Sequence, residues 1–270
     1  MYLINFIKDK NIILIDTSYY VFHRYFATFR WFTFQKIEVN VDEITSNDVF
    51  MQAFYKHVNN DMKKLCKRWN TTMSNVLFCM DCMRCDIWRN DIFDQYKAAR
   101  TQSQNFNRKI FPLFYEYISK LKIQFVSSER LEGDDIIYLT QNMLKKKLQN
   151  VNIIIITNDN DFLQLVDTNV LVFNMQFKEL KTRGTNNPKI DLQMKAIYGD
   201  RSDNIPKIGQ GITKEKALSI ASMPEEEMIE YMKQNNIYDK FIFNMKLISF
   251  DNIPKEYALK FTKSIKIAFA

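Results

Sequence analysis

The sequence predicts an α/β fold in which helices flank a central, mostly parallel sheet. Short, continuous runs of β-branched and other apolar residues recur along the chain, which is typical of strands buried in a parallel sheet. Segments with a helical spacing of apolar residues separate these runs. Two of the runs stop directly at an aspartate and a third is followed by one three residues later, as expected where the strands of an open α/β sheet carry ligand-binding residues at their ends.

The predicted elements alternate between strand and helix, and the chain shows no internal repeat. Continuous apolar runs predict the strands, and periodic segments predict the helices. In the helix that follows Glu132, acids lie at the start, which is the electrostatically favourable end for them. Strands are expected at 11–15, 76–80, 122–127, 153–157 and 170–173, and helices at 48–67, 110–120, 134–148 and 160–166.

Acidic residues follow predicted strands or stand beside predicted helix starts at five places. Because the carboxyl ends of parallel strands meet at one edge of a sheet, these acids are expected to share one site. Carboxylates held close together raise one another's pKa, so the site needs cations, and Mg²⁺ and Mn²⁺ prefer oxygen ligands. The candidate metal ligands are Asp16, Asp81, Glu132, Asp134, Asp135, Asp159, Asp161, Asp200 and Asp203.

Each acidic motif also has a simpler interpretation. A single aspartate after a strand is commonly a turn residue or a helix N-cap, so it is the coincidence of five motifs that favours a shared metal site. Zinc is not expected, because Cys79, Cys82 and Cys85 lack a second set of paired ligands. His23 and His57 show no partner for nucleophilic catalysis.

Length and charge restrict the class of protein. The 270 residues can bury a proper core, and no stretch of about eighteen uncharged apolar residues is present. The opening segment, Met1 to Ile7, is too short for a signal peptide, so a soluble, intracellular protein is expected. A net charge of +7 coexists with the acidic clusters, so the remaining surface must be basic and suits a polyanionic partner.

Between residues 84 and 109, basic and aromatic side chains are interleaved without strand alternation. Such residues beside an acidic site indicate a guide for nucleic acid, although a solvated helix and loop would show the same pattern. Tyr25, Phe26 and Trp31 are candidates for stacking on a terminal base or base pair, with core packing as the alternative. The interleaved residues are Arg84, Trp88, Arg89, Phe93, Tyr96, Lys97, Arg100, Phe106, Arg108 and Lys109.

A turn with two glycines follows the last acidic cluster and precedes a lysine-bearing amphipathic stretch. Helix-hairpin-helix elements of this kind direct backbone N–H groups and a helix N-terminus at phosphate oxygens without reading bases. A plain connecting turn is the alternative. The candidate DNA-binding residues are therefore Tyr25, Arg84, Gly209, Gly211, Lys214 and Lys216.

Six motifs, in order, resemble those of the flap endonuclease-like 5′ nucleases, which include the 5′ nuclease domain of bacterial DNA polymerase I and the phage 5′–3′ exonucleases. The resemblance implies a PIN-like 5′ nuclease core with a helical arch and a helix-hairpin-helix DNA-binding element. It is carried by residues 15–18, 78–81, 96–100, 131–135, 157–161 and 199–206. The expected organisation is a nuclease core at 1–190 with its basic arch at about 84–110, a helix-hairpin-helix region at 191–225 and a C-terminal helical region at 226–270.

The resemblance also implies roles for the candidate residues. The nine acids would hold two Mg²⁺ ions, which Mn²⁺ can replace, and Lys97 and Arg100 would contact the scissile phosphate. Family hairpins grip duplex DNA through a monovalent cation such as K⁺. Two positions depart from the family pattern: Thr17 stands where a glycine is common, and Thr213 stands where the hairpin usually carries one, in a turn one residue longer.

The implied activity is structure-dependent hydrolysis of DNA phosphodiester bonds, as a 5′–3′ exonuclease and flap endonuclease. Two metal ions about 4 Å apart would activate water and stabilise the attacking and leaving oxygens. The expected partners are DNA with 5′ ends, flaps or nicks and RNA–DNA hybrids; a monomer is expected, and no clamp-binding motif is visible. A PIN-type ribonuclease and a non-catalytic duplex DNA-binding module are the alternatives. A haloacid dehalogenase-type phosphatase would need a second aspartate at the position of Ser18.

Overall fold

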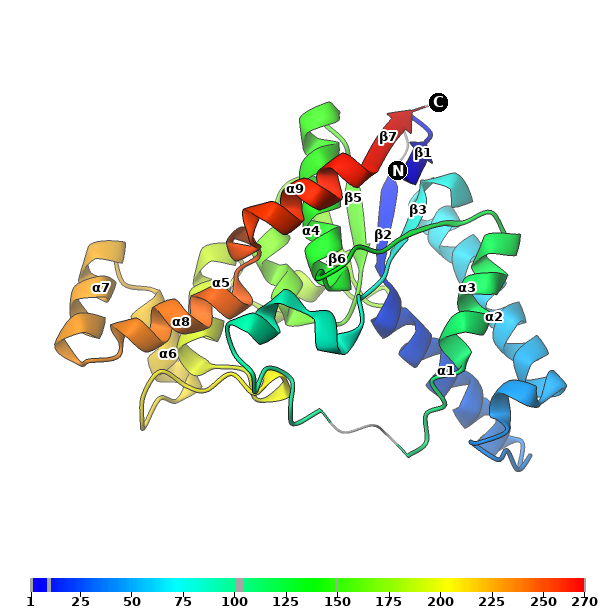
Figure 1. Ribbon diagram of the computed structural model, residues 1–270, viewed down its shortest axis with the longest axis horizontal. Coiled ribbons are helices and arrows are strands. Elements are labelled where there is room, and N and C mark those ends of the chain that lie inside the picture. Colours follow the sequence, from blue (N-terminus) through cyan, green and yellow to red (C-terminus); the bar gives the residue numbers. More distant parts are fainter. Residues whose placement is uncertain (1, 9–10, 101–103, 149, 270) are drawn as a thin grey trace.

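A five-stranded sheet of parallel strands lies at the centre of the computed structural model, which describes residues 2–8, 11–100, 104–148 and 150–269 (Figure 1). The strand order is β4-β3-β2-β5-β6, and every neighbouring pair is parallel. The five strands expected from the sequence are therefore confirmed. They are β2 (Ile12–Asp16), β3 (Val76–Cys79), β4 (Gln124–Val126), β5 (Ile153–Ile156) and β6 (Val170–Phe173).

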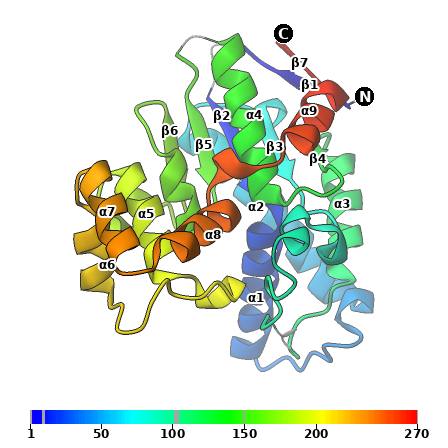
Figure 2. The same ribbon diagram turned by 60° about the vertical axis from the view of Figure 1, so that its left-hand side comes forward.

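Helices cover both faces of this sheet (Figures 1 and 2). On one face, Ile13 and Ile154 enter an apolar cluster with α1, α2 and α3. On the other face, Leu14 and Ile155 pack with α4 and α9. Both faces are thus buried, which explains the continuous apolar runs of the strands. The bounds are α1 (Thr17–Phe34), α2 (Asp48–Arg68), α3 (Ile110–Lys120), α4 (Gly133–Lys147) and α9 (Lys255–Ser264).

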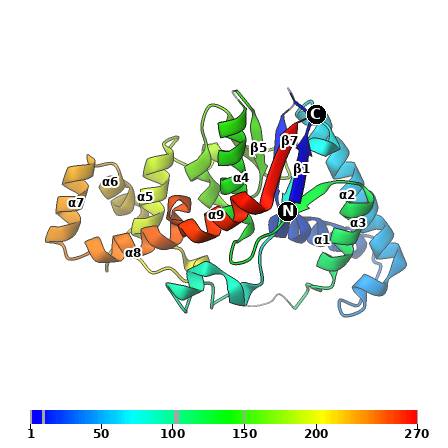
Figure 3. The ribbon, with the colours of Figure 1, turned by 45° about the horizontal axis from the view of Figure 1, so that its top comes forward.

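Two terminal strands, β1 (Tyr2–Phe6) and β7 (Ile265–Phe269), pair in parallel beside the main sheet, so the two described ends of the chain lie together (Figure 3). Ile4 and Ile267 join the apolar cluster on the α4 face. Sequence patterns indicated neither strand, because the partner of each lies at the opposite end of the chain. Within the described residues, the predicted C-terminal helical region is therefore helical up to α9 and ends in β7.

A lobe of helices stands beside the sheet, with an apolar cluster of its own (Figure 1). Ile197, Ala217 and Phe241 meet in this cluster and hold three of its helices together. Within the described residues, no helix is long and apolar enough to cross a bilayer. The lobe consists of α5 (Pro188–Tyr198), α6 (Lys214–Ala221), α7 (Glu225–Gln234) and α8 (Tyr238–Ile248).

Two helix predictions need correction. The segment expected to be a helix at 160–166 is a 3₁₀ turn (Asn160–Leu165), capped by Asp159 and ended by the extended residue Val166. Conversely, α1 was not expected, because its sequence is rich in aromatic residues, which have only a moderate helix propensity. It begins directly at the end of β2, where the Asp16 side chain accepts a hydrogen bond from the N–H of Tyr19.

The basic segment at 84–110 is not the helical arch that the resemblance implied. Its described residues before α3 form 3₁₀ and other turns and contain no α-helix, and residues 101–103 lie outside the described part of the chain. The extended conformation of Ile87 and the positive φ of 56° at Lys97 both interrupt a helix. The 3₁₀ turns are Arg84–Asp86 and Trp88–Asp91.

Candidate metal centre

Three strands bring aspartates to the middle of the carboxyl edge of the sheet. Asp16 ends β2, Asp81 follows β3 and Asp159 follows β5, and β2 lies between the other two strands. These three acids line one cavity of about 1150 Å³, together with Glu132 and Asp134 from the start of α4. The structure thus places acids from distant parts of the sequence at one edge, as expected, whereas their role as metal ligands stays a prediction.

Asp16 and Asp81 form the charged centre of the cavity. Burial, and then the charge of Asp81, raises the pKa of Asp16 to about 7. Asp16 accepts hydrogen bonds from the N–H of Tyr19 (3.0 Å) and the hydroxyl of Thr157 (2.9 Å). Asp81 accepts a hydrogen bond from the hydroxyl of Ser18. These neutral donors fix the two carboxylates without cancelling their charge, so a cation would stabilise the pair.

Gly133 allows the start of α4 to lie against β3. Its N–H donates a hydrogen bond of 2.7 Å to Asp81. A Cβ atom at this position would stand 2.9 Å from the carbonyl oxygen of Cys79, a distance that real Cβ atoms do not adopt. The glycine therefore keeps the acids of α4 close to Asp81.

The acids at the start of α4 have different surroundings. Burial, and then repulsion from Asp135 and Glu132, raises the pKa of Asp134 well above its usual value. Burial would also raise the pKa of Glu132, but Lys97 and Arg89 outweigh it and hold that pKa below its usual range. Oxygens of the three carboxylates lie within 4.8 Å of one another. Glu132 and Asp134 line the cavity and are suited to hold a metal ion.

Asp135 has an environment that argues against the metal-ligand role expected for it. Its carboxylate accepts hydrogen bonds from Trp88 Nε1 (2.9 Å), from the Arg89 guanidinium (2.8 and 2.9 Å) and from the N–H of Glu132 (3.1 Å). It is fully buried and is not among the described residues that line the cavity. Asp135 therefore holds Arg89 and the first turn of α4.

A second acidic group lies where α5 ends. Oxygens of Asp161, Asp200 and Asp203 lie within 4.8 Å of one another. Lys195 of α5 forms ion pairs with Asp161 and, at 2.8 Å, with Asp200. Burial would raise the pKa of Asp200, but Lys195 outweighs it and lowers that pKa to about 2. Sequence reasoning missed Lys195; its position in the last turn of a helix that leads into Asp200 was the available signal.

Lys97 and Arg100 lie against the acids, on the rim of the same cavity. Lys97 forms an ion pair with Glu132 and stands 3.9 Å from Asp203, with which Arg100 also pairs. Burial would lower the pKa of Lys97, but Glu132 outweighs it and raises that pKa well above its usual value. Arg84 donates hydrogen bonds to the carbonyl oxygens of Lys97 and Arg100, and so shapes the segment that carries both.

Several aromatic and basic residues expected to contact nucleic acid are buried instead. Tyr25 is completely buried, and its ring centroid lies 4.7 Å from that of Phe106, so the prediction that it stacks on a base is wrong. Trp88 and Arg89 are buried as well and cannot form part of an exposed guide. Phe22, which was not among the candidates, is 36% exposed and lines the cavity.

The glycine turn ends at the rim of the cavity. Gly211 has a positive φ of 67°, whereas Gly209 does not. Thr213 caps α6 by accepting a hydrogen bond of 3.2 Å from the N–H of Lys216. Lys214, the first residue of α6, is exposed and lines the cavity, so the amino end of α6 reaches the cavity that holds the acids.

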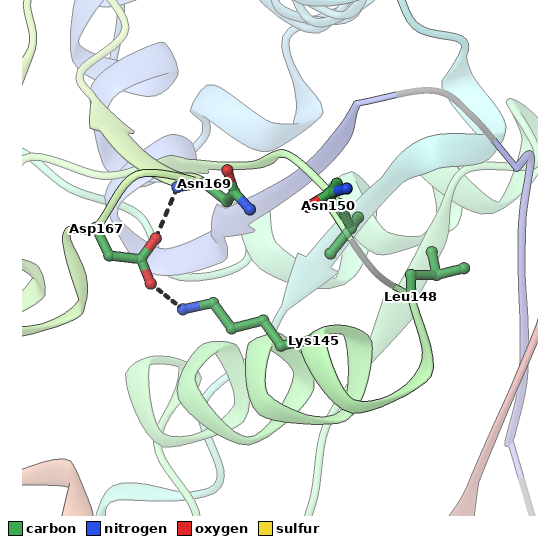
Figure 4. A pocket seen from close by; sticks show the side chains of 6 residues that line it. Lys145, Leu148, Asn150, Asp167 and Asn169 are labelled. Carbon is green, nitrogen blue, oxygen red and sulfur yellow. Dashed lines mark hydrogen bonds and ion pairs between the residues drawn. The ribbon is translucent and has the colours of Figure 1, made fainter.

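A smaller cavity of about 360 Å³ lies at the opposite, amino-terminal edge of the sheet (Figure 4). Lys145 and Asp167 form an ion pair across it, and Asp167 also accepts a hydrogen bond from the N–H of Asn169. Its charged groups therefore satisfy one another, which makes this ion pair a useful control for experiments on the acidic cavity.

The donor atoms of the acidic cavity fit a hard divalent cation. Its acidic side chains supply the oxygen ligands that such ions prefer. Burial and neighbouring acids raise the pKa values of Asp16 and Asp134, and a bound cation would offset that cost. Cys82 also lines the cavity, but burial and the charges of Glu132 and Asp81 raise its pKa to about 12. In the metal-free protein this thiol is therefore protonated.

Replacing Asp16 by asparagine should stabilise the metal-free protein at pH 8. The ordinary pKa of 3.8 applies in the unfolded chain and about 7 in the fold, so ionisation of Asp16 removes stability as pH rises from about 4 to about 7. The loss is at most about 4 kcal/mol. Melting temperatures of Asp16→Asn and wild-type protein in EDTA should agree at pH 4 and diverge by pH 8, and a pH-independent difference would contradict the assigned cause.

Comparison with known proteins places this chain in the class of 5′ nucleases. The chain matches the family described as "5′-3′ exonuclease, N-terminal resolvase-like domain" over residues 11–192. The chain therefore belongs to this 5′–3′ exonuclease family.

Individual relatives agree with this family. The chain is 29% identical over 208 residues to the 5′–3′ exonuclease of Buchnera aphidicola subsp. Schizaphis graminum, covering 74% of this chain and 66% of that protein. It is 27% identical over 256 residues to the DNA polymerase I of Lactococcus lactis subsp. cremoris, covering 89% of this chain but only 28% of that polymerase. The chain thus spans about two thirds of the first relative's length and little more than a quarter of the second's.

Solved structures confirm the fold. The phage T5 flap endonuclease, in a pseudo-enzyme-product complex with DNA and metal ions, matches with a TM-score of 0.60 and 17% identity, covering 94% of this chain and 97% of that one. The phage T5 5′-exonuclease with bound divalent zinc ions matches with a TM-score of 0.58 and 18% identity, covering 94% and 98%.

Proposed function

We propose that this protein is a divalent-metal-dependent, structure-dependent 5′ nuclease that hydrolyses DNA phosphodiester bonds. The observation that carries the proposal is the cavity in which acids from three strand ends and two helix ends meet, with Lys97 and Arg100 on its rim. Membership of the 5′–3′ exonuclease family supports the same reaction.

Two groups of acids would hold Mg²⁺, or Mn²⁺ in its place. Bound ions would lower the pKa of a water nucleophile and stabilise negative charge on the phosphate oxygens. Lys97 and Arg100 would donate hydrogen bonds to the phosphoryl oxygens, where charge grows during the reaction. The first group is Asp16, Asp81, Glu132 and Asp134, which line the cavity. The second is Asp159 and Asp200, which also line it, with Asp161 and Asp203, whose oxygens lie within 4.8 Å of Asp200.

The proposed substrates are DNA duplexes with 5′ ends, flaps or nicks, and RNA–DNA hybrids, with a monomer as the acting species. The exposed Lys214 and Lys216 and the turn at Gly211 would grip the duplex, with K⁺ as the proposed cation there. A PIN-type ribonuclease would share these acids. A non-catalytic DNA-binding module would gain nothing from a group of carboxylates that repel one another.

A cleavage panel tests this proposal. Purified protein is incubated with Mg²⁺ and end-labelled flap, nicked, blunt and single-stranded DNA, RNA–DNA hybrid and single-stranded RNA, and product lengths are read on a denaturing gel. We expect cleavage near the 5′ end of duplex-containing DNA. Cleavage of single-stranded RNA alone would favour the PIN-type ribonuclease, and binding without cleavage on every substrate would favour the DNA-binding module.

Replacing Gly211 by valine should weaken duplex binding more than single-strand binding. The positive φ of 67° strains any β-branched residue, although no described atom lies within 4 Å of the Cβ position. Gly211→Asn is the matched control, because asparagine tolerates this conformation. Affinities for both DNA forms are measured across a salt series. Equal losses on duplex and single strand would mean that the turn only connects α5 and α6.

A further inference from the structure

Residues 244–250, the end of α8 and the turn after it, are connected by hydrogen bonds to three acid-bearing segments: the start of α4, the turn at Asp161 and the loop that presents Asp200. We call this segment the α8 brace. It lies outside residues 11–192, which match the 5′–3′ exonuclease family. Three side chains, Arg89, Gln164 and Asn244, make the connections.

Arg89 joins the brace to the start of α4. Its Nε donates a hydrogen bond of 2.8 Å to the carbonyl oxygen of Leu247. The other end of the guanidinium forms ion pairs of 2.8 Å with Glu132 and with Asp135. Because the side chain is only 2% exposed, the brace and the acids are fixed to one buried, planar group.

Gln164 joins the brace to the acids after β5. Its amide nitrogen donates hydrogen bonds to the carbonyl oxygens of Asp161 (2.9 Å) and Ile248 (3.2 Å). Its amide oxygen accepts a hydrogen bond of 3.0 Å from the N–H of Phe250. The three partners are backbone groups, so Gln164 ties the main chain at Asp161 to the main chain of the brace.

Asn244 joins the brace to the segment that carries Asp200. Its amide nitrogen donates hydrogen bonds to the carbonyl oxygens of Ala196 (2.8 Å) and Pro206 (2.7 Å). Pro206 follows Ile205, which exchanges two backbone hydrogen bonds of 2.8 and 2.9 Å with Asp200. The buried Asn244 therefore holds both ends of the loop that presents Asp200.

We propose that the α8 brace sets the spacing of the acid-bearing segments and thereby their affinity for metal ions, with Gln164 as a positioning residue of the metal centre. The inference rests on the proposed function. Crowded carboxylates repel one another, so segments without a common anchor would separate. Groups that orient metal ligands typically change metal affinity by about 10- to 100-fold when they are removed.

The test compares Gln164→Met with a matched control, Gln124→Met. Gln124 also donates to two backbone carbonyls, Asn5 (2.8 Å) and Ser74 (2.7 Å), and accepts from one N–H, that of Asn5 (2.7 Å). It is partly buried like Gln164, but it lies at the amino end of β4, away from the acids. Methionine keeps the length of the side chain and removes all three hydrogen bonds.

Mn²⁺ binding to the metal-free protein is measured by titration calorimetry, alongside the melting temperature in EDTA and the Mn²⁺ concentration that half-saturates cleavage. Both variants should melt a few degrees below wild type, because each loses the same set of hydrogen bonds. Only Gln164→Met should weaken Mn²⁺ binding, by about tenfold. Asn244→Ala should weaken it similarly and serves as a second test if Gln164→Met folds poorly.

Equal Mn²⁺ affinities for Gln164→Met and Gln124→Met would overturn the role proposed for the α8 brace and would leave the proposed nuclease function intact. Conversely, if wild-type protein binds Mn²⁺ but cleaves no substrate, the nuclease proposal fails. The difference in Mn²⁺ affinity between the two variants then still tests whether the α8 brace positions the acids.

Discussion

Replacing Asp81 by asparagine should lower kcat on a 5′-flap substrate by at least about 10³-fold, equivalent to about 4 kcal/mol of transition-state stabilisation. Asp81 lies between Asp16 and the start of α4, where it accepts hydrogen bonds from Ser18 and Gly133. Asparagine keeps the size of the side chain and removes its charge, so the site loses attraction for cations. Single-turnover rates at saturating protein measure the effect.

The matched control is Asp167→Asn. Asp167 is also an aspartate in an ion pair beside the sheet, but it lies at the opposite edge, against Lys145 (Figure 4). Its replacement should leave kcat unchanged, and neither variant should lose much DNA affinity. A near wild-type rate for Asp81→Asn would refute the assignment of the metal centre.

Replacing Lys97 by alanine should lower kcat by about 10²- to 10³-fold and weaken DNA binding much less. Lys97 is held beside Glu132 and Asp203 at the rim of the cavity, where phosphoryl oxygens would accumulate charge. The site should survive the change, because Arg89 and Tyr96 still hydrogen-bond to Glu132, each at about 3 Å. Rates and affinities are measured on the same 5′-flap substrate.

Lys145→Ala is the control for charge alone, because Lys145 forms its ion pair with Asp167 at the far edge of the sheet. It should leave kcat unaltered. If the defect of Lys97→Ala disappears at saturating DNA, Lys97 contributes to binding only and has no part in stabilising the transition state.

The sheet and the gathering of the acids were predictable because both depend on local signals. A continuous apolar run indicates a buried strand, and an aspartate directly after it must lie at the carboxyl edge, as Asp16 and Asp81 do. Parallel strands then bring these ends together whatever the intervening sequence. The same reasoning does not predict the environment of Asp135, whose carboxylate pairs with Arg89 and does not line the cavity.

The remaining features depend on contacts that no local pattern encodes. Tyr25 and Arg89 have the composition of nucleic-acid contacts, yet the packing of distant elements buries them. Gln164 meets the end of α8, 84 residues further along the chain. The pairing of β1 with β7 joins the two described ends of the chain. Such long-range contacts form only when the tertiary structure brings distant segments together, so sequence spacing alone does not specify them.

The polarity of cleavage tests the central claim most directly. A flap strand that carries different labels at its 5′ and 3′ ends, annealed in a duplex, is incubated with wild-type protein in Mg²⁺ and in EDTA. A metal-dependent 5′ nuclease should release the 5′ label first, and only with Mg²⁺ present. Release of the 3′ label first, or equal cleavage in EDTA, would contradict the function proposed for this cavity.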